Sequence, residues 1–489
     1  METSAPAPTI RFLLPPRVPQ RLWQAGIVAI AVLLGTAAAF RPGLAVAAVV
    51  AAAFVPLVLT KLNVGLCMLL YLSFMESLSG VGGGLSLTKL VGVLLVVGWL
   101  AAAATGPASE RRAMLAREPL LGGAVVLFAL WAAASVVWAD QPSTAASAVL
   151  RFALNFALFP IVLAGIRERR HVVWVFVVFV AGSLSAMTLG IIQGTSDPAA
   201  GGRLTGAGLD ANDLGELLVV AIILALSLAA NRRWLAMWRL VAACAAATAA
   251  VGLFMTVSRG GLVGLSAAAL VAPFAVGRGR RAAAVVLIVV ALVGTVGWFA
   301  TIAPAHAVER IENPKAAGGS GRLDLWTVGW RIVNAHPING VGAGNFRLVS
   351  VQYLLRPGRT DRDVYIVTKP KVPHNIYLNV LAELGIVGLA LFAAILALSL
   401  RSTLRAVRAF ASRGDTTMEL LTRGLFIALV GLLVCEFFSP ALYSKQLWFL
   451  LALGPAFLAI ARRGAREPVR GTPSPRVREL PAKTVVERH

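Results

Sequence analysis

The sequence is dominated by apolar runs that are each about as long as a helix crossing a lipid bilayer. Fourteen such runs fit between residues 22 and 460, and most are joined by short polar connections. About 20 apolar residues are needed to cross roughly 30 Å of hydrocarbon as an α-helix. The hydrophobic share of 58% also exceeds the roughly 45 to 50% of soluble proteins. We therefore expect an all-α polytopic membrane protein with about 12–14 transmembrane helices.

Three of these runs leave the number of spans open. Leu22–Phe40 resembles a signal peptide, with Ala37 and Ala39 spaced as at a cleavage site, but it is long enough to span and is expected to be a retained first helix. Leu62–Ser79 is interrupted by Glu76, and Leu262–Val276 is short. Removal of one adjacent pair early in the chain would leave twelve spans without inverting any later loop.

The distribution of Lys and Arg predicts the orientation of the spans. With fourteen spans and the N-terminus inside, 29 of the 45 basic residues fall in inner segments, 6 in outer segments and 10 in one large outer loop. Cytoplasmic loops are enriched in Lys and Arg, so this bias accounts for the formal net charge of +23. No compact basic domain is present that would bind nucleic acid.

This orientation divides the chain into five parts, in a protein expected in the bacterial inner membrane with both termini cytoplasmic. They are a cytoplasmic tail (1–21), an N-terminal transmembrane region of about eleven helices (22–300), a large, partly helical external loop (301–377), a C-terminal transmembrane region of about three helices (378–461) and a basic, disordered cytoplasmic tail (462–489).

The external loop is the longest non-apolar segment between two apolar runs, and long insertions of this kind are usually functional or disordered. Its tryptophans, histidines and Gly-rich turn favour function. Arg322–Asn334 is predicted to be a helix that lies against an apolar surface, with Leu323, Trp326, Trp330 and Val333 spaced by three and four residues. Pro337 and the following glycines end it.

A motif extends from this loop into the next apolar run. It consists of Gly-Arg, a nearby Trp, Pro-x-x-Gly-x-Gly-x-x-x-Phe, His-Asn-x-Tyr-Leu and Glu-x-Gly-x-x-Gly, here Gly321, Arg322, Trp326, Pro337, Gly340, Gly342, Phe346, His374, Asn375, Tyr377, Leu378, Glu383, Gly385 and Gly388. The pattern resembles the signature region of the O-antigen ligase and O-antigen polymerase family of membrane glycan-transferring enzymes. The resemblance covers about 70 residues.

This resemblance implies a glycosyltransferase in the cell envelope that moves a glycan from undecaprenyl diphosphate to an acceptor hydroxyl at the outer face of the membrane. Its partners would be the lipid-linked donor, a glycan or glycolipid acceptor and membrane lipids, without a metal or another cofactor. A ligase and a polymerase of this family would share the same donor site. A lipid-linked oligosaccharide flippase is the alternative outside the enzyme class, although a transporter has little need for the large loop.

Three arginines from separate parts of the chain, Arg203, Arg259 and Arg322, reach the predicted outer face. A guanidinium is always charged and presents a planar fork that matches phosphate oxygens. We expect the three to bind the donor diphosphate. The alternatives are that they pair with acidic side chains or lipid head groups, and that Arg322 caps or anchors the loop helix.

His374 is the candidate for proton transfer, because an imidazole with a pKa near 6.5 accepts a proton close to neutral pH. Pro373 precedes it, and a helix is expected to start around Asn375. Asn375 forms a pair with His374 that matches the family motif. Glu383, about two turns further along, either faces the same cavity or pairs with an arginine. Both are expected to contribute to substrate binding.

No metal site is expected. Asp361 and Asp363 resemble the acidic pairs that hold a cation in many sugar transferases, but the basic residues around them indicate a charge-balanced loop. Cys67, Cys244 and Cys435 each lie inside an apolar run without the spacing of metal ligands, so we expect neither zinc nor structural disulfides.

Overall fold

The computed structural model describes residues 55–75, 87–105, 118–194, 196–197, 203–277, 281–282, 285, 322–354 and 372–463. The chain divides into two compact units, residues 1–61 and 62–489, and the features below belong to the second unit. Several expectations lie outside the described residues. They concern the N-terminal tail, the run at 22–40, Glu76, most of the run at 282–300, the loop segment with Asp361 and Asp363, and the tail after residue 463.

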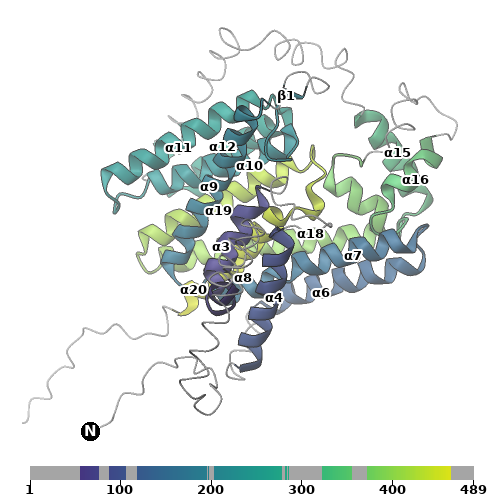
Figure 1. The fold of residues 1–489 in the computed structure, drawn as a ribbon, viewed down its shortest axis with the longest axis horizontal. Helices are drawn as coiled ribbons and strands as arrows, with labels where there is room; N and C mark the ends of the chain where they lie inside the picture. Colours follow the sequence, from purple (N-terminus) through teal and green to yellow (C-terminus); the bar gives the residue numbers. More distant parts are fainter. Residues whose placement is uncertain are drawn as a thin grey trace, which may run out of the picture. The chain divides into compact units, whose positions relative to one another are not determined.

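Helices make up nearly all of the described structure (Figure 1). Before the external loop they are α3 (Leu62–Ser73), α4 (Leu87–Thr105), α6 (Pro119–Ala134), η1 (Ser135–Val137), α7 (Pro142–Phe156), α8 (Leu158–Gly165), α9 (Arg169–Ile192), α10 (Ala211–Ala229), α11 (Ala236–Met255) and α12 (Arg259–Ala275). In and after the loop they are α15 (Arg322–Ala335), α16 (Phe346–Leu354), α18 (Ile376–Ala411), α19 (Thr416–Cys435), η5 (Ala441–Tyr443) and α20 (Lys445–Arg463). Strands β1 (Ser196–Asp197) and β2 (Arg203–Leu204) pair antiparallel between α9 and α10.

Eight helices among the described residues are long and apolar enough to cross a membrane, with α7 and α8 counted as one. The predicted class is confirmed, because the protein is an all-α polytopic membrane protein. The helices α3 and α12 are apolar but short, and they coincide with the two weak runs Leu62–Ser79 and Leu262–Val276.

Polar side chains fix where several of these helices begin. Asp210 accepts hydrogen bonds from the backbone N–H groups of Asn212 and Asp213 at the start of α10. Ser258 caps α12, Asn375 caps α18 and Asp415 caps α19 in the same manner. An oxygen in this position satisfies one of the N–H groups that a helix start leaves unpaired.

The helices α10 and α20 form the centre of the bundle, since both are buried along nearly their whole length. α10 packs against α9, α11, α12 and α19, and α20 packs against α8, α18 and α19. The crossing of α12 and α19 is close because Gly264 faces Cys435 and Gly431 faces Ala268. Small residues allow membrane helices to approach in this way.

The helices α15 and α16 form a separate small core against the N-terminal half of α18 (Figure 1). The helix predicted at Arg322–Asn334 is confirmed as α15, but only part of its predicted apolar face is buried, namely Val333 and, in part, Trp326. Leu325, Val328 and Ile332 are fully buried, whereas Leu323 and Trp330 are 69% and 55% exposed. The reason is that α15 packs on α16 and α18, and the side that carries Leu323 and Trp330 is left open.

Candidate functional site

Most of the predicted site residues lie at the end of the bundle where α10, α12 and α18 begin and α19 ends. Asn375 is the N-cap of α18, and its Oδ1 accepts hydrogen bonds from Tyr377 N and Leu378 N at 3.0 Å each. The backbone N–H of Ile376, the first residue of α18, donates to the carbonyl of Glu436 at 3.1 Å. The start of α18 is therefore attached to the turn that follows α19.

His374 has a left-handed backbone conformation, with φ of +49°. This conformation is uncommon for a residue other than glycine and costs of the order of 1 kcal/mol or more. Contacts of the residue before it and the residue after it fix this backbone conformation of His374. Pro373 O accepts a hydrogen bond from Trp326 Nε1 at 2.9 Å, and Asn375 caps the helix. The loop helix α15 and the start of α18 thereby fix the direction of the half-buried imidazole.

His374 opens into a cleft of about 470 Å³. The cleft is bounded by α7, the Gly-rich turn with the start of α16, the N-terminal half of α18 and the turn before α20. Its lining includes three residues predicted for the site, His374, Asn375 and Glu383, together with Ser143, Thr144, Ser147, Ala148, Arg151, Gly344, Arg347, Leu348, Val372, Pro373, Asn379, Pro440 and Tyr443.

The Gly-rich turn of the motif docks into a break in α18. At Gly385 the helix leaves helical geometry, with φ of +67° and ψ of −169°. The carbonyls of Ala382 and Glu383 accept hydrogen bonds from Val341 N at 3.1 Å and Gly342 N at 2.8 Å. Leu384 O accepts from Trp131 Nε1 at 2.8 Å. The turn at Gly340–Gly344 and the break at Gly385 are therefore bonded to each other, and we call this contact the joint.

The Glu383 side chain completes this joint. Its carboxylate is 2% exposed and accepts hydrogen bonds from Gly344 N at 2.7 Å and Phe346 N at 3.3 Å. Glu383 lines the cleft, one of the two predicted alternatives, and it also fixes the turn that carries Gly344. The sequence does not indicate this second role, because the two segments are separated by nearly forty residues of chain.

A second group of polar residues surrounds Arg203. Its Nε donates to Thr256 O at 2.8 Å, and its Nη2 donates to Asn212 Oδ1 at 2.8 Å. Asn212 Oδ1 also accepts a hydrogen bond from Ser258 Oγ at 3.3 Å. These contacts join the hairpin before α10 to the turn between α11 and α12, next to Arg259.

Arg322 reaches the same region from the other side. Its Nη2 donates to Phe438 O at 3.0 Å, and its guanidinium carbon lies 5.8 Å from the centre of the Phe438 ring. A Cβ at Gly260 would come within 2.7 Å of Phe438 Cβ, so α12 begins directly against this turn. Arg259, at the first position of α12, has no hydrogen-bond or ion-pair partner within the described ranges.

Three carboxyl groups belong to the first turns of α10 and to the turn after α19. Asp213 accepts a hydrogen bond from Ser439 Oγ at 3.1 Å. Glu216 and Glu436 are 3% and 0% exposed, and neither oxygen of Glu436 finds a hydrogen-bond partner among the described residues. Burial, and to a smaller extent the nearby Asp213, raise the pKa of Glu436 well above its usual range. Burial in this position favours the neutral form of the Glu436 carboxyl.

The turn 436–443 connects the two groups of residues. It carries Glu436, Phe438 against Arg322, Ser439 against Asp213, and Pro440 and Tyr443 in the wall of the cleft. The structure thus brings His374, Asn375 and Glu383 into one cleft, and places Arg203, Arg259 and Arg322 around the neighbouring start of α12. None of the three arginines lines the cleft itself; the turn 436–443 links them to it.

Three of the cleft residues that were not predicted for the site, Arg151, Arg347 and Tyr443, carry a charge or an aromatic hydroxyl. Arg151 lies with its guanidinium carbon 5.6 Å from the centre of the Tyr443 ring, and Arg347 follows Phe346 at the start of α16. Burial raises the pKa of Tyr443 well above its usual range, with the negative charge of Glu383 as a second cause. For Arg347, the sequence does offer one signal of a place in the site, because it directly follows Phe346 of the motif.

No group of three or more His, Cys, Asp or Glu residues in the described segments is arranged to hold a metal ion. Asp361 and Asp363 lie outside those segments.

Comparison with known proteins supports the sequence resemblance. The model of the family described as O-antigen ligase matches residues 244–393. This segment runs from α11 to the middle of α18 and includes Arg259, Arg322, His374, Asn375 and Glu383 but not Arg203. No curated protein matches the chain. Residues 244–393 are thus similar to the O-antigen ligase family, which confirms the predicted resemblance.

Proposed function

We propose that the protein is a membrane glycosyltransferase that transfers a glycan from an undecaprenyl-diphosphate-linked donor to an acceptor hydroxyl, as an O-antigen ligase does. The observation that carries the proposal is the convergence described above. His374 lines a cleft whose wall continues, through the turn 436–443, to the region of Arg203, Arg259 and Arg322. The family match over residues 244–393 supports the same class of reaction.

In this mechanism the acceptor oxygen attacks the anomeric carbon of the donor sugar. A bond forms between them while the bond from that carbon to the diphosphate oxygen breaks. The acceptor hydroxyl gives its proton to the imidazole of His374. The departing undecaprenyl diphosphate keeps the bonding electron pair, and the three arginines stabilise the resulting negative charge. The proposed reaction needs no metal or other cofactor.

The other predicted residues have supporting roles in this proposal. Glu383 holds the Gly344 turn against the cleft, and Asn375 holds the start of α18 behind His374. We propose that both also contribute to substrate binding, since both side chains line the cleft. Ser143, Thr144 and Ser147 of α7 add hydroxyl groups on the opposite wall, and such groups suit a carbohydrate acceptor because they both donate and accept hydrogen bonds.

We place the cleft at the outer face of the bacterial inner membrane, with both termini in the cytoplasm. The bias of Lys and Arg toward the opposite loops supports this orientation. The external loop, residues 301–377, then supplies α15, α16 and His374.

The test is transfer by the purified, full-length protein in detergent, with a synthetic undecaprenyl-diphosphate-linked glycan and a range of acceptors. The expected products are undecaprenyl diphosphate and a new glycoside. Turnover without a membrane gradient excludes a flippase as the explanation. His374→Ala is expected to reduce transfer by about 10²- to 10⁴-fold, while donor binding is retained.

His336→Ala is the matched control. His336 lies in the same loop, but its Nε2 is 2.9 Å from Tyr353 Oη in the core of α15 and α16, outside the cleft. We expect it to keep most of the transfer activity. Transfer by His374→Ala at the wild-type rate would remove the proposed role. In a deletion strain, accumulation of lipid-linked polymer supports a ligase, whereas accumulation of single repeat units supports a polymerase of the same family.

A further inference from the structure

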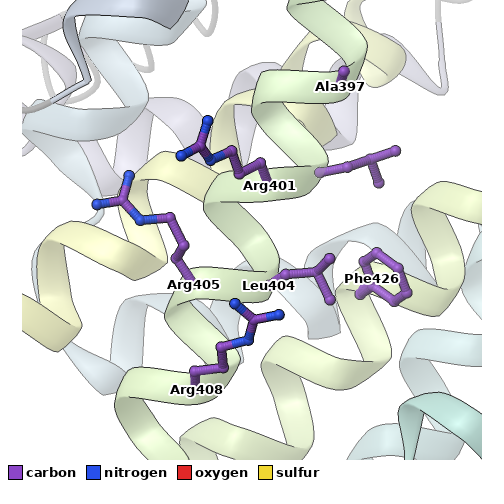
Figure 2. A pocket seen from close by; sticks show the side chains of 7 residues that line it. Ala397, Arg401, Leu404, Arg405, Arg408 and Phe426 are labelled. Carbon is purple, nitrogen blue, oxygen red and sulfur yellow. The ribbon is translucent and has the colours of Figure 1, made fainter.

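A second pocket, of about 500 Å³, lies between α18 and α19 (Figure 2). Its walls carry three arginines of one helix, Arg401, Arg405 and Arg408. The remainder of the lining is apolar and consists of Ala397, Leu400, Leu404 and Phe426. We call this the arginine pocket. In Figure 2 the guanidinium groups of Arg401 and Arg405 extend to the same side of α18, and that of Arg408 turns toward Leu404.

The position of the pocket along α18 is set by the length of the helix. From Gly385 to Arg405 the chain is helical for twenty residues, a rise of about 30 Å. This equals the thickness of the hydrocarbon layer. With the candidate site at one membrane surface, the arginines reach the other surface, and Ala397 and Leu400 lie one to two turns deeper in the hydrocarbon.

The pocket keeps an excess of positive charge. Arg405 lies 3.3 Å from Glu118 of the α6 start, but the same carboxylate also pairs with Arg462 at 2.9 Å. Within the described parts of the chain, Arg401 and Arg408 have no ion-pair partner. Both are exposed. Two guanidinium groups at one rim of an apolar pocket are thus available to an anion.

We propose that the arginine pocket binds an anionic phospholipid from the membrane leaflet opposite the candidate active site. The lipid phosphate would lie between Arg401 and Arg408, and an acyl chain would run along Ala397, Leu400, Leu404 and Phe426. Basic pockets between transmembrane helices are suited to such head groups, because each guanidinium donates directed hydrogen bonds to phosphate oxygens.

Two other occupants fit less well. The chain after residue 463 carries six basic and three acidic residues, so its net positive charge is repelled by the pocket. A small soluble phosphate would match the arginines but would leave the apolar wall of Ala397, Leu400, Leu404 and Phe426 unfilled. The inference does not depend on the proposed glycan transfer, since it concerns the other end of α18.

The experiment uses the purified, delipidated, full-length protein in detergent micelles. Phosphatidylglycerol or phosphatidylcholine is titrated in at equal mole fractions, and thermal unfolding is followed by tryptophan fluorescence. We expect phosphatidylglycerol to raise the unfolding midpoint more than phosphatidylcholine. In the double variant R401Q/R408Q the apparent affinity for phosphatidylglycerol should fall about tenfold or more.

The matched control is R232Q/R233Q. It also removes two exposed arginines from a loop predicted on the same membrane side, between α10 and α11. It should keep the wild-type response. Ala397→Trp fills the apolar wall without changing any charge and should weaken phosphatidylglycerol binding as well.

Three results would overturn the proposal. The first is an equal loss of phosphatidylglycerol affinity in R401Q/R408Q and R232Q/R233Q, and the second is an equal rise of the wild-type unfolding midpoint with the two lipids. The third is a rise of the midpoint with soluble glycerol 3-phosphate as large as that with phosphatidylglycerol, which Ala397→Trp leaves intact. The last of these would show a soluble-anion site instead.

Discussion

Gly385→Ala tests whether the joint between α18 and the Gly-rich turn supports the site. Gly385 has φ of +67° and ψ of −169°, a region almost limited to glycine, so a side chain there costs about 1–3 kcal/mol of strain. A Cβ would also overlap the carbonyl of Ile338, and the turn would have to move. That movement breaks the hydrogen bonds of Val341 N and Gly342 N to α18, each worth about 1 kcal/mol.

The expected total is about 3–5 kcal/mol of lost folding free energy. A suitable control is Gly414→Ala, because Gly414 has nearly the same φ, +66°, but no atom near its would-be Cβ. Both variants carry left-handed strain, and only Gly385→Ala displaces the turn. We expect Gly385→Ala to lower the unfolding temperature in detergent by clearly more than Gly414→Ala and to abolish glycan transfer. Equal unfolding temperatures and equal activity would show that the joint does not hold the site.

Two further substitutions probe the polar groups beside the cleft. Arg203→Lys keeps the positive charge but cannot reproduce both directed hydrogen bonds to Thr256 O and Asn212 Oδ1. We expect transfer at low donor concentration to fall about tenfold, since charge-assisted hydrogen bonds are worth about 1.5–3 kcal/mol, and a wild-type rate would contradict the assignment. The raised pKa of Glu436 means that the folded protein retains a proton that the unfolded chain loses above about pH 4.3. The contribution of Glu436 to the free energy of unfolding is therefore largest at low pH. It is lost as the pH rises toward the pKa of Glu436 in the folded protein. Glu436→Gln should make the unfolding temperature less dependent on pH between about 5 and 8, and an unchanged pH dependence would show that Glu436 is not buried in its neutral form.

The local start signals in the sequence predict the local structure around the site. Pro373 precedes a helix that begins after Asn375, and Arg322 opens a loop helix. These features depend on neighbouring residues only, so a single sequence contains the information. The C-terminal transmembrane region predicted from residue 378 begins with α18, which continues to Ala411. The last turns of this helix carry arginines, so hydropathy alone does not locate its end.

Contacts between distant segments were not predictable from periodicity. The docking of Gly342 on Glu383, the position of Arg151 in the cleft and the buried face of α15 all depend on how separate helices pack. Trp330 is an example. Its spacing from Trp326 indicates one apolar side of α15, but Val328 and Ile332 form a second apolar side. Packing against α16 and α18 buries the side with Val328 and Ile332. The sequence pattern alone carried no preference between them.

The most direct test of the central claim is a structure of the His374→Ala variant with the lipid-linked donor bound. We predict that the diphosphate lies within hydrogen-bond distance of Arg259 and at least one of Arg203 and Arg322, and that the anomeric carbon faces the cleft beside position 374. A diphosphate bound elsewhere, with Arg203 and Arg322 still bonded only to protein groups and Arg259 not in contact with the donor, would contradict the proposed chemistry.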